Sequence, residues 1–335
     1  MVGGAEGRAE GNASLIRSIG WPAWRYSQVV PSSPSSPLDP ADPAEGVLAG
    51  PFRGTAVLAE GLLTRAQLYG PRYRRVYPDV YLPAGLELDL ATRSRAAYLL
   101  VRDRGGVLAG YSAAAALGAD CAPPDAPAEV LVAANTRAHP GLRICRGTAT
   151  GQEVTTVDGM RVTAPLRTAW DLARRLPLVE AVVAVDAVAA AGSFAPADLL
   201  ARRAGTPGAR GSRRLAEVVA LAEPRSRSPS LTRLRVGLLR AGLPPPAVRY
   251  SVCDEHRVEL ARVDLAYPEA KLAIEYDGAD ELGADGFASQ VARDRLRDAE
   301  LAGQGWQTLR LDADDIGVHL PRTARRVERL LALRG

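Results

Sequence analysis

The stretch VDLAYPEAKLAIEYDG, residues 263–278, contains two short apolar runs on either side of Pro268-Glu269-Ala270. Each run is typical of a β-strand, and the segment between them predicts a turn that pairs the two strands antiparallel. Side chains in a strand alternate between its two faces. This alternation places Leu272, Ile274 and Tyr276 on one face, and Ala273, Glu275 and Asp277 on the other.

Three acidic residues of this hairpin are predicted to lie close together. The pairing brings Asp264 opposite Glu275 or one residue away, and directly opposed residues have β-carbons about 5 Å apart. Asp277 follows on the same face as Glu275. Carboxylates at this spacing repel one another. Mg²⁺, which is commonly held by one or two carboxylates plus water and phosphate, is the simplest compensation. The pattern therefore favours metal-dependent phosphodiester chemistry, with Asp264, Glu275 and Asp277 as candidate catalytic and metal-binding residues.

Length and composition set the broad class. The chain has 335 residues, of which 47% are hydrophobic and 24% charged, as expected for a globular protein of roughly two or three domains. The net charge of +4 permits a nucleic-acid partner without requiring one. Three scattered cysteines without a CxxC pair, and three scattered histidines, argue against a zinc site or a disulfide framework. No signal peptide or transmembrane-length apolar run is evident, so we expect a reduced cytoplasmic location and no membrane partner.

Changes in composition along the chain predict four segments. Residues 1–45 are rich in Gly, Ser, Pro and Ala, and we expect a disordered tail. A translation start assigned too far upstream would explain this segment equally well. Residues 46–85 are predicted to be winged-helix-like, 86–223 to form a mostly helical α+β middle domain, and 224–335 to form the last domain.

Residues 46–85 contain two helical runs, the second capped by Thr64, followed by an alternating hairpin, RRVYPDVYLPAG. This order is that of a winged helix, although the expected recognition helix is short and the domain is therefore degenerate. The winged-helix interpretation makes Arg65, Arg74 and Arg75 candidate DNA contacts. The alternative is a small α/β unit whose arginines are simply solvated.

The last domain is predicted to be an α/β sandwich around a mixed sheet. Its expected elements in chain order are a helix at 230–241, strands at 248–253, 258–266 and 272–277, a helix at 287–302, a strand at 306–311 and a helix at 321–333. In the helix at 287–302, Asp294, Arg297 and Asp298 are spaced by three and four residues and share one polar side. That side contacts either phosphate or the neighbouring sheet.

Two resemblances rest on these motifs. SPSLTRLRVGLLRAGLP, ARVDLAYPEAKLAIEYDG and RDRLRDAELAGQGWQTLRL, taken in order, resemble the PD-(D/E)XK nuclease superfamily and its very-short-patch-repair (Vsr)-like domains of unknown function, common in actinobacteria. This resemblance covers residues 228–316 and implies a restriction-endonuclease-like mixed sheet flanked by helices. LLTRAQL, RRVYPDVYL and TAPLRTAWDLARRLPLVEAVVAVDA, within residues 55–222, resemble antitoxins of AbiEi-type (type IV) toxin–antitoxin systems.

The Vsr-like resemblance assigns Asp264 as the metal-binding Asp, and Glu275 and Asp277 as the E-x-D of the motif. It implies Arg293 and Arg297 as nucleic-acid contacts. The chain departs from the pattern at two positions, with Leu231 where related domains have a Glu and Glu281 where they have a His. Leu231 cannot bind a cation. Glu281 can serve as a further metal ligand but is a poor general acid near neutral pH.

These observations support three hypotheses. The first is a Mg²⁺-dependent endonuclease acting on DNA, with activity reduced by the two departures. The second is a DNA-binding transcriptional regulator or antitoxin whose nuclease fold is inactive, and whose arginines bind phosphate in a salt-dependent manner. The third is a structural partner of a toxin, which in AbiEi-type systems is a nucleotidyltransferase.

Overall fold

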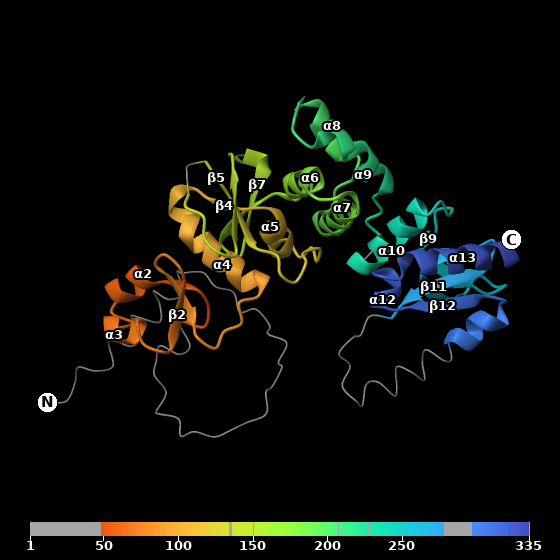
Figure 1. Cartoon of the computed structure of the whole chain (residues 1–335), viewed down its shortest axis with the longest axis horizontal. Helices are drawn as coiled ribbons and strands as arrows, with labels where there is room; N and C mark the ends of the chain where they lie inside the picture. The colour runs from red at the N-terminus through yellow and green to blue at the C-terminus, as the bar shows by residue number, and fades with distance from the viewer. Residues whose placement is uncertain are drawn as a thin grey trace, which may run out of the picture. The chain divides into compact units, whose positions relative to one another are not determined.

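The computed structural model describes residues 48–133, 136–149, 151–206, 208–226, 228–277 and 297–334, and it has a mixed α/β fold (Figure 1). The predicted tail at 1–45, Glu281 and Arg293 lie outside these residues. The chain divides into two compact units. The first contains the described residues up to 117 together with 122–168, and the second contains 118–121 and the described residues from 169 onward.

The first unit begins with a small three-stranded sheet in the order β1-β3-β2. Its elements in chain order are β1 Phe52–Arg53, α2 Gly54–Ala59, α3 Arg65–Leu68, β2 Tyr73–Tyr77 and β3 Val80–Pro83. Thr64 caps α3, because its hydroxyl accepts from the N–H of Gln67 at 3.2 Å while the Gln67 side chain accepts from the N–H of Thr64 at 2.8 Å. The predicted pair of helices and the hairpin are confirmed, and α3 is a single turn of four residues.

The rest of the first unit is built on a five-stranded mixed sheet in the order β6-β5-β4-β8-β7. Its elements are α4 Leu90–Val101, η1 Arg102–Arg104, β4 Val107–Leu108, α5 Gly110–Ala116, β5 Ala128–Val132, β6 Leu142–Arg146, η2 Gly151–Glu153, β7 Val154–Val157 and β8 Met160–Thr163. The sequence predicts two helices within residues 92–118, which correspond to α4 and α5, and strands at 130–132, 142–144 and 160–162, which lie in β5, β6 and β8. It did not predict β4, which lies in the middle of the sheet between β5 and β8.

Helices then continue from the first unit into the second. In chain order they are α6 Pro165–Arg175, α7 Leu178–Gly192, α8 Asp198–Ala204, η3 Ser212–Arg214 and α9 Leu215–Leu221. Eight of the fifteen residues of α7 are buried, and the helix packs against both α9 and α10 (Pro229–Arg240). The predicted boundary at 223/224 therefore falls inside one compact unit.

A four-stranded sheet in the order β12-β11-β10-β9 forms the remainder of the second unit. Its elements are β9 Ala247–Cys253, β10 Glu259–Tyr267, β11 Leu272–Tyr276, β12 Gln307–Leu311, α12 Ala313–Ile316 and α13 Leu320–Arg334, and residues 297–303 are also helical. Leu272 and Ile274 pack with α10 and α13 on one face. Ala273 packs with Leu301 on the other. The predicted mixed sheet with helices on both faces is confirmed, and the alternation of β11 places its residues on the faces expected. Residues 287–296 of the helix predicted at 287–302 lie outside the described residues.

Candidate functional site

The carboxylates predicted from the hairpin lie where β10 and β11 pair. The antiparallel register joins Leu265 to Ile274, and one further step along it places Asp264 opposite Glu275. The Asp264 carboxylate accepts a hydrogen bond from the backbone N–H of Tyr276 at 3.1 Å. The register therefore agrees with the predicted neighbourhood of Asp264 and Glu275.

The strand β10 changes face at Asp264. Val263 packs in the cluster that contains Leu301, whereas Leu265 packs in the cluster beneath α10 and α13. Strict alternation would put Val263 and Leu265 on the same face, so the strand is irregular between them. At the same level of the neighbouring strand β9, Arg249 has a φ of +52°. Irregularities of this kind re-aim a side chain and are frequent next to active sites.

Glu275 is the most perturbed carboxyl of this region. Its side chain is 12% exposed, and its Oε1 accepts a hydrogen bond from Nη2 of Arg297 at 2.7 Å. Burial raises the pKa of Glu275 to about 7; the charge of Arg297 opposes this increase, and the nearby carboxylate of Asp264 adds to it. Glu275 therefore gains and loses its proton near neutral pH.

Asp277 and Asp298 share one arginine. Arg310 on β12 donates from Nη1 to Asp277 Oδ1 at 3.2 Å, and from Nη2 to Asp298 Oδ2 at 3.0 Å. The parallel register of β11 and β12 places Arg310 directly beside Glu275. We refer to Asp264, Glu275, Asp277, Arg297, Asp298 and Arg310 as the sheet-end cluster. Arg297 and Asp298 thus contact the sheet, which is one of the two alternatives expected for this helix.

The described part of the predicted metal site does not fit Mg²⁺ as it stands. No group of three or more His, Cys, Asp and Glu side chains within the described ranges is placed to hold a metal ion. Arg297 and Arg310 instead bind oxygens of Glu275 and Asp277, and charge-assisted bonds of this kind compete with a cation for the same lone pairs. Leu231, at the position of the missing Glu, is buried in α10 and offers no ligand atom.

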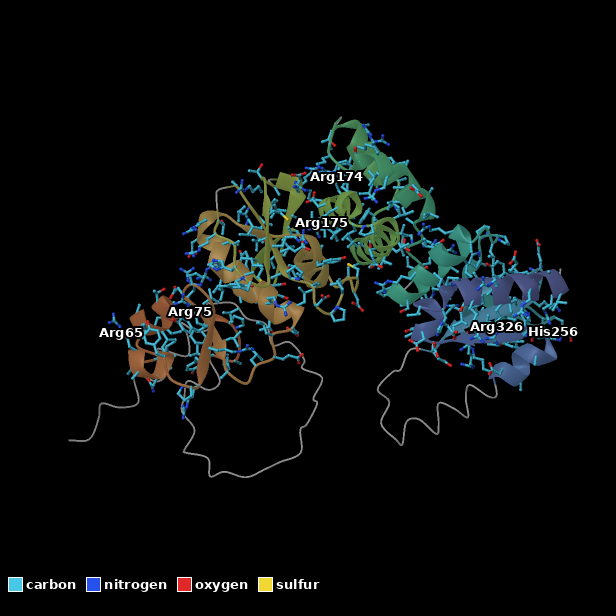
Figure 2. The ribbon with its side chains drawn as sticks, in the orientation of Figure 1. Arg65, Arg75, Arg174, Arg175, His256 and Arg326 are labelled. Atoms are coloured by element: carbon cyan, nitrogen blue, oxygen red, sulfur yellow. The ribbon has the colours of Figure 1, made fainter. Side chains whose placement is uncertain are left out.

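The candidate DNA contacts of the first unit are exposed. Arg65 begins α3 and Arg75 lies on β2 (Figure 2). Arg74 precedes Arg75 on the same strand. Nη2 of Arg74 donates to the carbonyl oxygen of Leu86 at 2.7 Å, which ties that side chain to the loop after β3. The side chain of Tyr69, at the end of α3, is 69% exposed. A single-turn α3 is too short to follow a major groove, so any DNA contact here is centred on phosphate.

A family model and two relatives match parts of the chain. Residues 106–221 match the family model of the AbiEi antitoxin C-terminal domain. The chain is also 30% identical over 181 residues to two uncharacterized proteins of Mycobacterium tuberculosis, one from strain CDC 1551 / Oshkosh and one from strain H37Rv. Each alignment covers 54% of this chain and 65% of the relative. No solved structure matched.

The family match supports part of the predicted AbiEi-type resemblance, which was placed at residues 55–222. It extends from β4 to α9 and therefore includes residues of both compact units. The Vsr-like resemblance of residues 228–316 stays a prediction. Of the described helices, none combines the length and the hydropathy needed to span a bilayer.

A buried cluster of polar residues joins the matched segment to helix α10. Asp186 on α7 is 1% exposed, and its carboxylate accepts from Nη2 of Arg235 at 2.8 Å and from the hydroxyl of Thr232 at 2.9 Å. It also accepts from the backbone N–H of Glu223 at 2.6 Å. Burial raises the pKa of Asp186 to about 6, while Arg235 and the other donors lower it. We refer to Asp186, Thr232 and Arg235 as the buried cluster.

Arg235 completes this cluster from α10. It donates to the carbonyl oxygen of Leu221 at 2.6 Å and to Ser226 Oγ at 3.2 Å. An aspartate within an apolar helical run such as 179–191 is expected to be a satisfied structural or interface group rather than a ligand, and the hydrogen bonds and ion pair of Asp186 agree with this expectation. The partner arginines, Arg235 here and Arg310 in the sheet-end cluster, were not identified from the sequence. Arg235 could have been identified from its position between Leu234 and Val236, within an otherwise apolar part of α10.

Proposed function

We propose that the chain is an antitoxin-like, DNA-binding regulator of a toxin–antitoxin pair. The observation that carries this proposal is the match of residues 106–221 to the AbiEi antitoxin C-terminal domain. The proposal accords with one of the three hypotheses drawn from the sequence, and it assigns the three-stranded sheet with α2 and α3 to DNA contact.

The charges of the small three-stranded sheet support the DNA-binding part of the proposal. Arg65 and Arg75 are exposed, and the exposed aromatic ring of Tyr69 lies close to them in sequence. Arginine side chains bind backbone phosphates and release condensed counterions, so such binding weakens steeply as salt concentration rises. Sequence preference would then depend on DNA shape and on few base contacts.

The sheet-end cluster supports the regulator over the nuclease. A hydrolytic metal site needs open carboxylate oxygens, whereas here Arg297 binds Glu275 and Arg310 binds Asp277. These pairs compensate the charges of Glu275 and Asp277 without a metal ion. An inactive endonuclease-like sheet held together by ion pairs is therefore the simpler interpretation of the described residues 228–277 and 297–334.

A binding assay tests the DNA-binding part. The full chain is titrated into fluorescent duplex DNA from the region upstream of its own gene, at several salt concentrations. Removing two phosphate contacts with Arg65→Ala/Arg75→Ala is expected to reduce the slope of log affinity against log salt by about 2. Arg143→Ala/Arg146→Ala removes the same charge from β6, where both arginines are exposed, and is the matched control. Equal slopes for the two double variants would refute the assignment.

A neutralisation assay tests the antitoxin part. The chain is co-expressed with a nucleotidyltransferase encoded beside its gene, and growth is compared with and without it. Rescue of growth by the full chain, retained in Arg65→Ala/Arg75→Ala, would show that neutralisation does not require the proposed DNA contacts. Growth arrest that is unaffected by the chain would contradict the antitoxin assignment.

Metal-dependent phosphodiester hydrolysis is the second candidate. It is favoured by the position of Asp264 opposite Glu275 and by the pKa of Glu275, raised to about 7. Plasmid and mismatched duplexes are incubated with pure protein and Mg²⁺ or Mn²⁺. Cleavage that disappears in both Asp264→Ala and Glu275→Ala would support hydrolysis, whereas cleavage that persists in both would identify a contaminant.

A further inference from the structure

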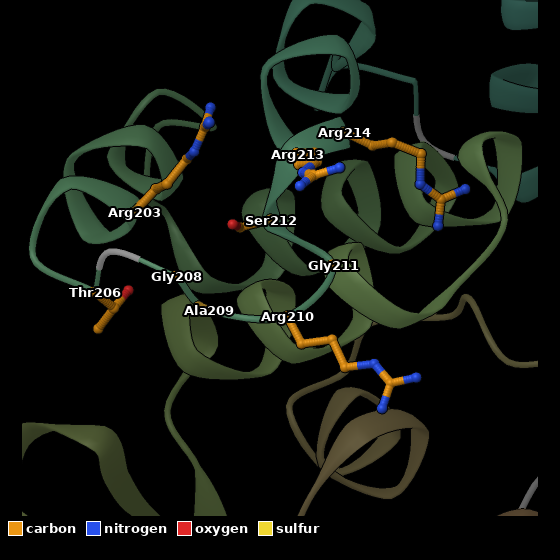
Figure 3. A pocket seen from close by; sticks show the side chains of 9 residues that line it. All are labelled: Arg203, Thr206, Gly208, Ala209, Arg210, Gly211, Ser212, Arg213 and Arg214. Atoms are coloured by element: carbon orange, nitrogen blue, oxygen red, sulfur yellow. The ribbon is translucent and has the colours of Figure 1, made fainter.

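A cavity of about 760 Å³ lies beside α8 and the loop that leads to η3 (Figure 3). Four arginines and two hydroxyl side chains line it, and none of its lining residues is acidic: Arg203, Thr206, Arg210, Ser212, Arg213 and Arg214. Figure 3 shows Arg203 and Thr206 to the left of the Ser212 hydroxyl and Arg213 and Arg214 to its right, and it shows the Arg210 side chain pointing away from Arg203. We refer to this cavity as the arginine pocket. Its volume lies within the usual range for small-molecule sites, about 300–1,000 Å³.

The loop of the arginine pocket is anchored to α6. Nε of Arg174 donates to the carbonyl oxygen of Arg210 at 2.7 Å, and Nη2 of Arg214 donates to the carbonyl oxygen of Leu176 at 3.2 Å. Gly211 has a φ of +82°, and a Cβ added there would collide with the carbonyl oxygen of Arg174. A residue with a side chain would therefore be both strained and crowded at this position. The hydrogen bonds to the carbonyl oxygens of Arg210 and Leu176 therefore fix the position of the segment that carries these arginines.

The charges of the arginine pocket are not compensated within the described part of the chain. Residues 199–216 contain five arginines and no acidic residue. Arg202 is placed over the ring of Trp170, whereas Arg203, Arg210 and Arg213 are exposed and have no side-chain hydrogen bond or ion pair with any described residue. Several guanidinium groups this close in the chain repel one another, and an anion between them would relieve the repulsion.

We propose that the arginine pocket binds closely spaced phosphate groups. Planar guanidinium groups match phosphate oxygens with two parallel hydrogen bonds, and the hydroxyls of Thr206 and Ser212 add neutral donors. The lining contains no aromatic side chain to stack on a base. Recognition is therefore of the phosphates themselves, either of a nucleoside triphosphate or of a nucleic-acid backbone. The site goes beyond the function proposed above, since it lies on α8 and the following loop and does not involve Arg65 or Arg75.

Calorimetric titration of the full chain tests this proposal. The probes are inorganic triphosphate, ATP and a duplex DNA of unrelated sequence, all without divalent cation so that the sheet-end cluster cannot contribute through a metal. Arg210→Ala/Arg213→Ala removes two charges from the arginine pocket. Arg325→Ala/Arg326→Ala removes two exposed arginines from α13 of the same unit and is the matched control. Thermal unfolding of both variants checks that each is folded.

The probes separate the two sources of phosphate. Binding of triphosphate and ATP that weakens at least about tenfold in Arg210→Ala/Arg213→Ala, but not in the control, supports a nucleotide ligand. Binding of DNA alone, with the same loss in the same variant, supports a nucleic-acid ligand. Absence of binding to all three probes, or an equal loss in both double variants, overturns the proposal. The assay of Arg65→Ala/Arg75→Ala is independent of these results, so either proposal can fail alone.

Discussion

The second unit contains two arginine–carboxylate clusters that have the same chemistry and differ in burial. In the buried cluster, the side chains of Arg235 and Asp186 are 6% and 1% exposed. In the sheet-end cluster, those of Arg310 and Asp277 are 30% and 59% exposed. A buried pair is costly to break because it leaves a charge without water or partner, whereas an exposed pair is readily replaced by hydration. The first cluster therefore specifies how helices pack, whereas the second leaves Arg310 and Asp277 accessible to solvent and ligands.

The largest effect is expected from breaking the buried cluster. Arg235→Met leaves the Asp186 carboxylate buried without its cation, and the free energy of unfolding should fall by about 3–5 kcal/mol. Urea denaturation measures the change. Asp186→Leu/Arg235→Met removes both charges and should recover most of the loss. Arg225→Ala, which removes an exposed partner of Glu223, is the control. A similar loss in the single and double variants would mean that packing volume, not charge, determines the cost.

The next effect is expected at Glu275. Arg297→Ala removes its guanidinium partner and should lower the free energy of unfolding by about 1–2 kcal/mol at pH 8, where Glu275 is charged. At pH 5 Glu275 is protonated in the folded protein, so the loss should be smaller. Denaturation at both pH values makes the comparison. A loss that does not depend on pH would indicate that Arg297 acts through the carbonyl oxygen of Arg262 instead.

Glu275 should also give the protein a pH-dependent stability. Its pKa is raised from 4.5 to about 7 on folding, so between these values the folded state holds a proton that the unfolded state has lost. The contribution is therefore fully present below about pH 4.5 and is lost as pH rises through 7. Relative to Glu275→Gln, the wild type should lose about 3 kcal/mol over this interval, at about 1.4 kcal/mol for each unit by which the pKa is raised. Parallel stability curves for the two proteins would disprove the assignment, and Glu255→Gln serves as an exposed control.

The smallest effect is expected at the exposed end of the cluster. Arg310→Ala should change the free energy of unfolding by less than about 1 kcal/mol, and the change should shrink as salt is added. A loss as large as that of Arg235→Met would remove the distinction drawn between the two clusters. The result also bears on the nuclease hypothesis, because Arg310→Ala frees the oxygens of Asp277. A thermal shift with Mn²⁺ that appears only in this variant would show that Arg310 blocks a cation site.

The alternation of side chains within single segments predicted the strands that carry the candidate site. It could not predict which residues far apart in the sequence contact one another. β11 alternates over five residues, so its faces and its pairing with β10 could be read from the sequence. β1 and β4 have two residues each, and two residues carry no periodicity. The change of face at Asp264 occurs beside Arg249 in a left-handed conformation, which has no sequence signal in a residue other than Gly, Asn or Asp. Partners such as Arg235 and Asp186, 49 residues apart, become neighbours only when helices pack.

The buried cluster spans the end of the segment that matches the antitoxin domain. Asp186 lies inside the segment that matches the antitoxin domain, whereas its donors Glu223, Thr232 and Arg235 all follow residue 221. Recombination that transferred the matched segment alone into another gene would separate an interior carboxylate from every one of these donors. A recipient of the first half of this bond network would therefore need a substitute for the donors that the second half supplies.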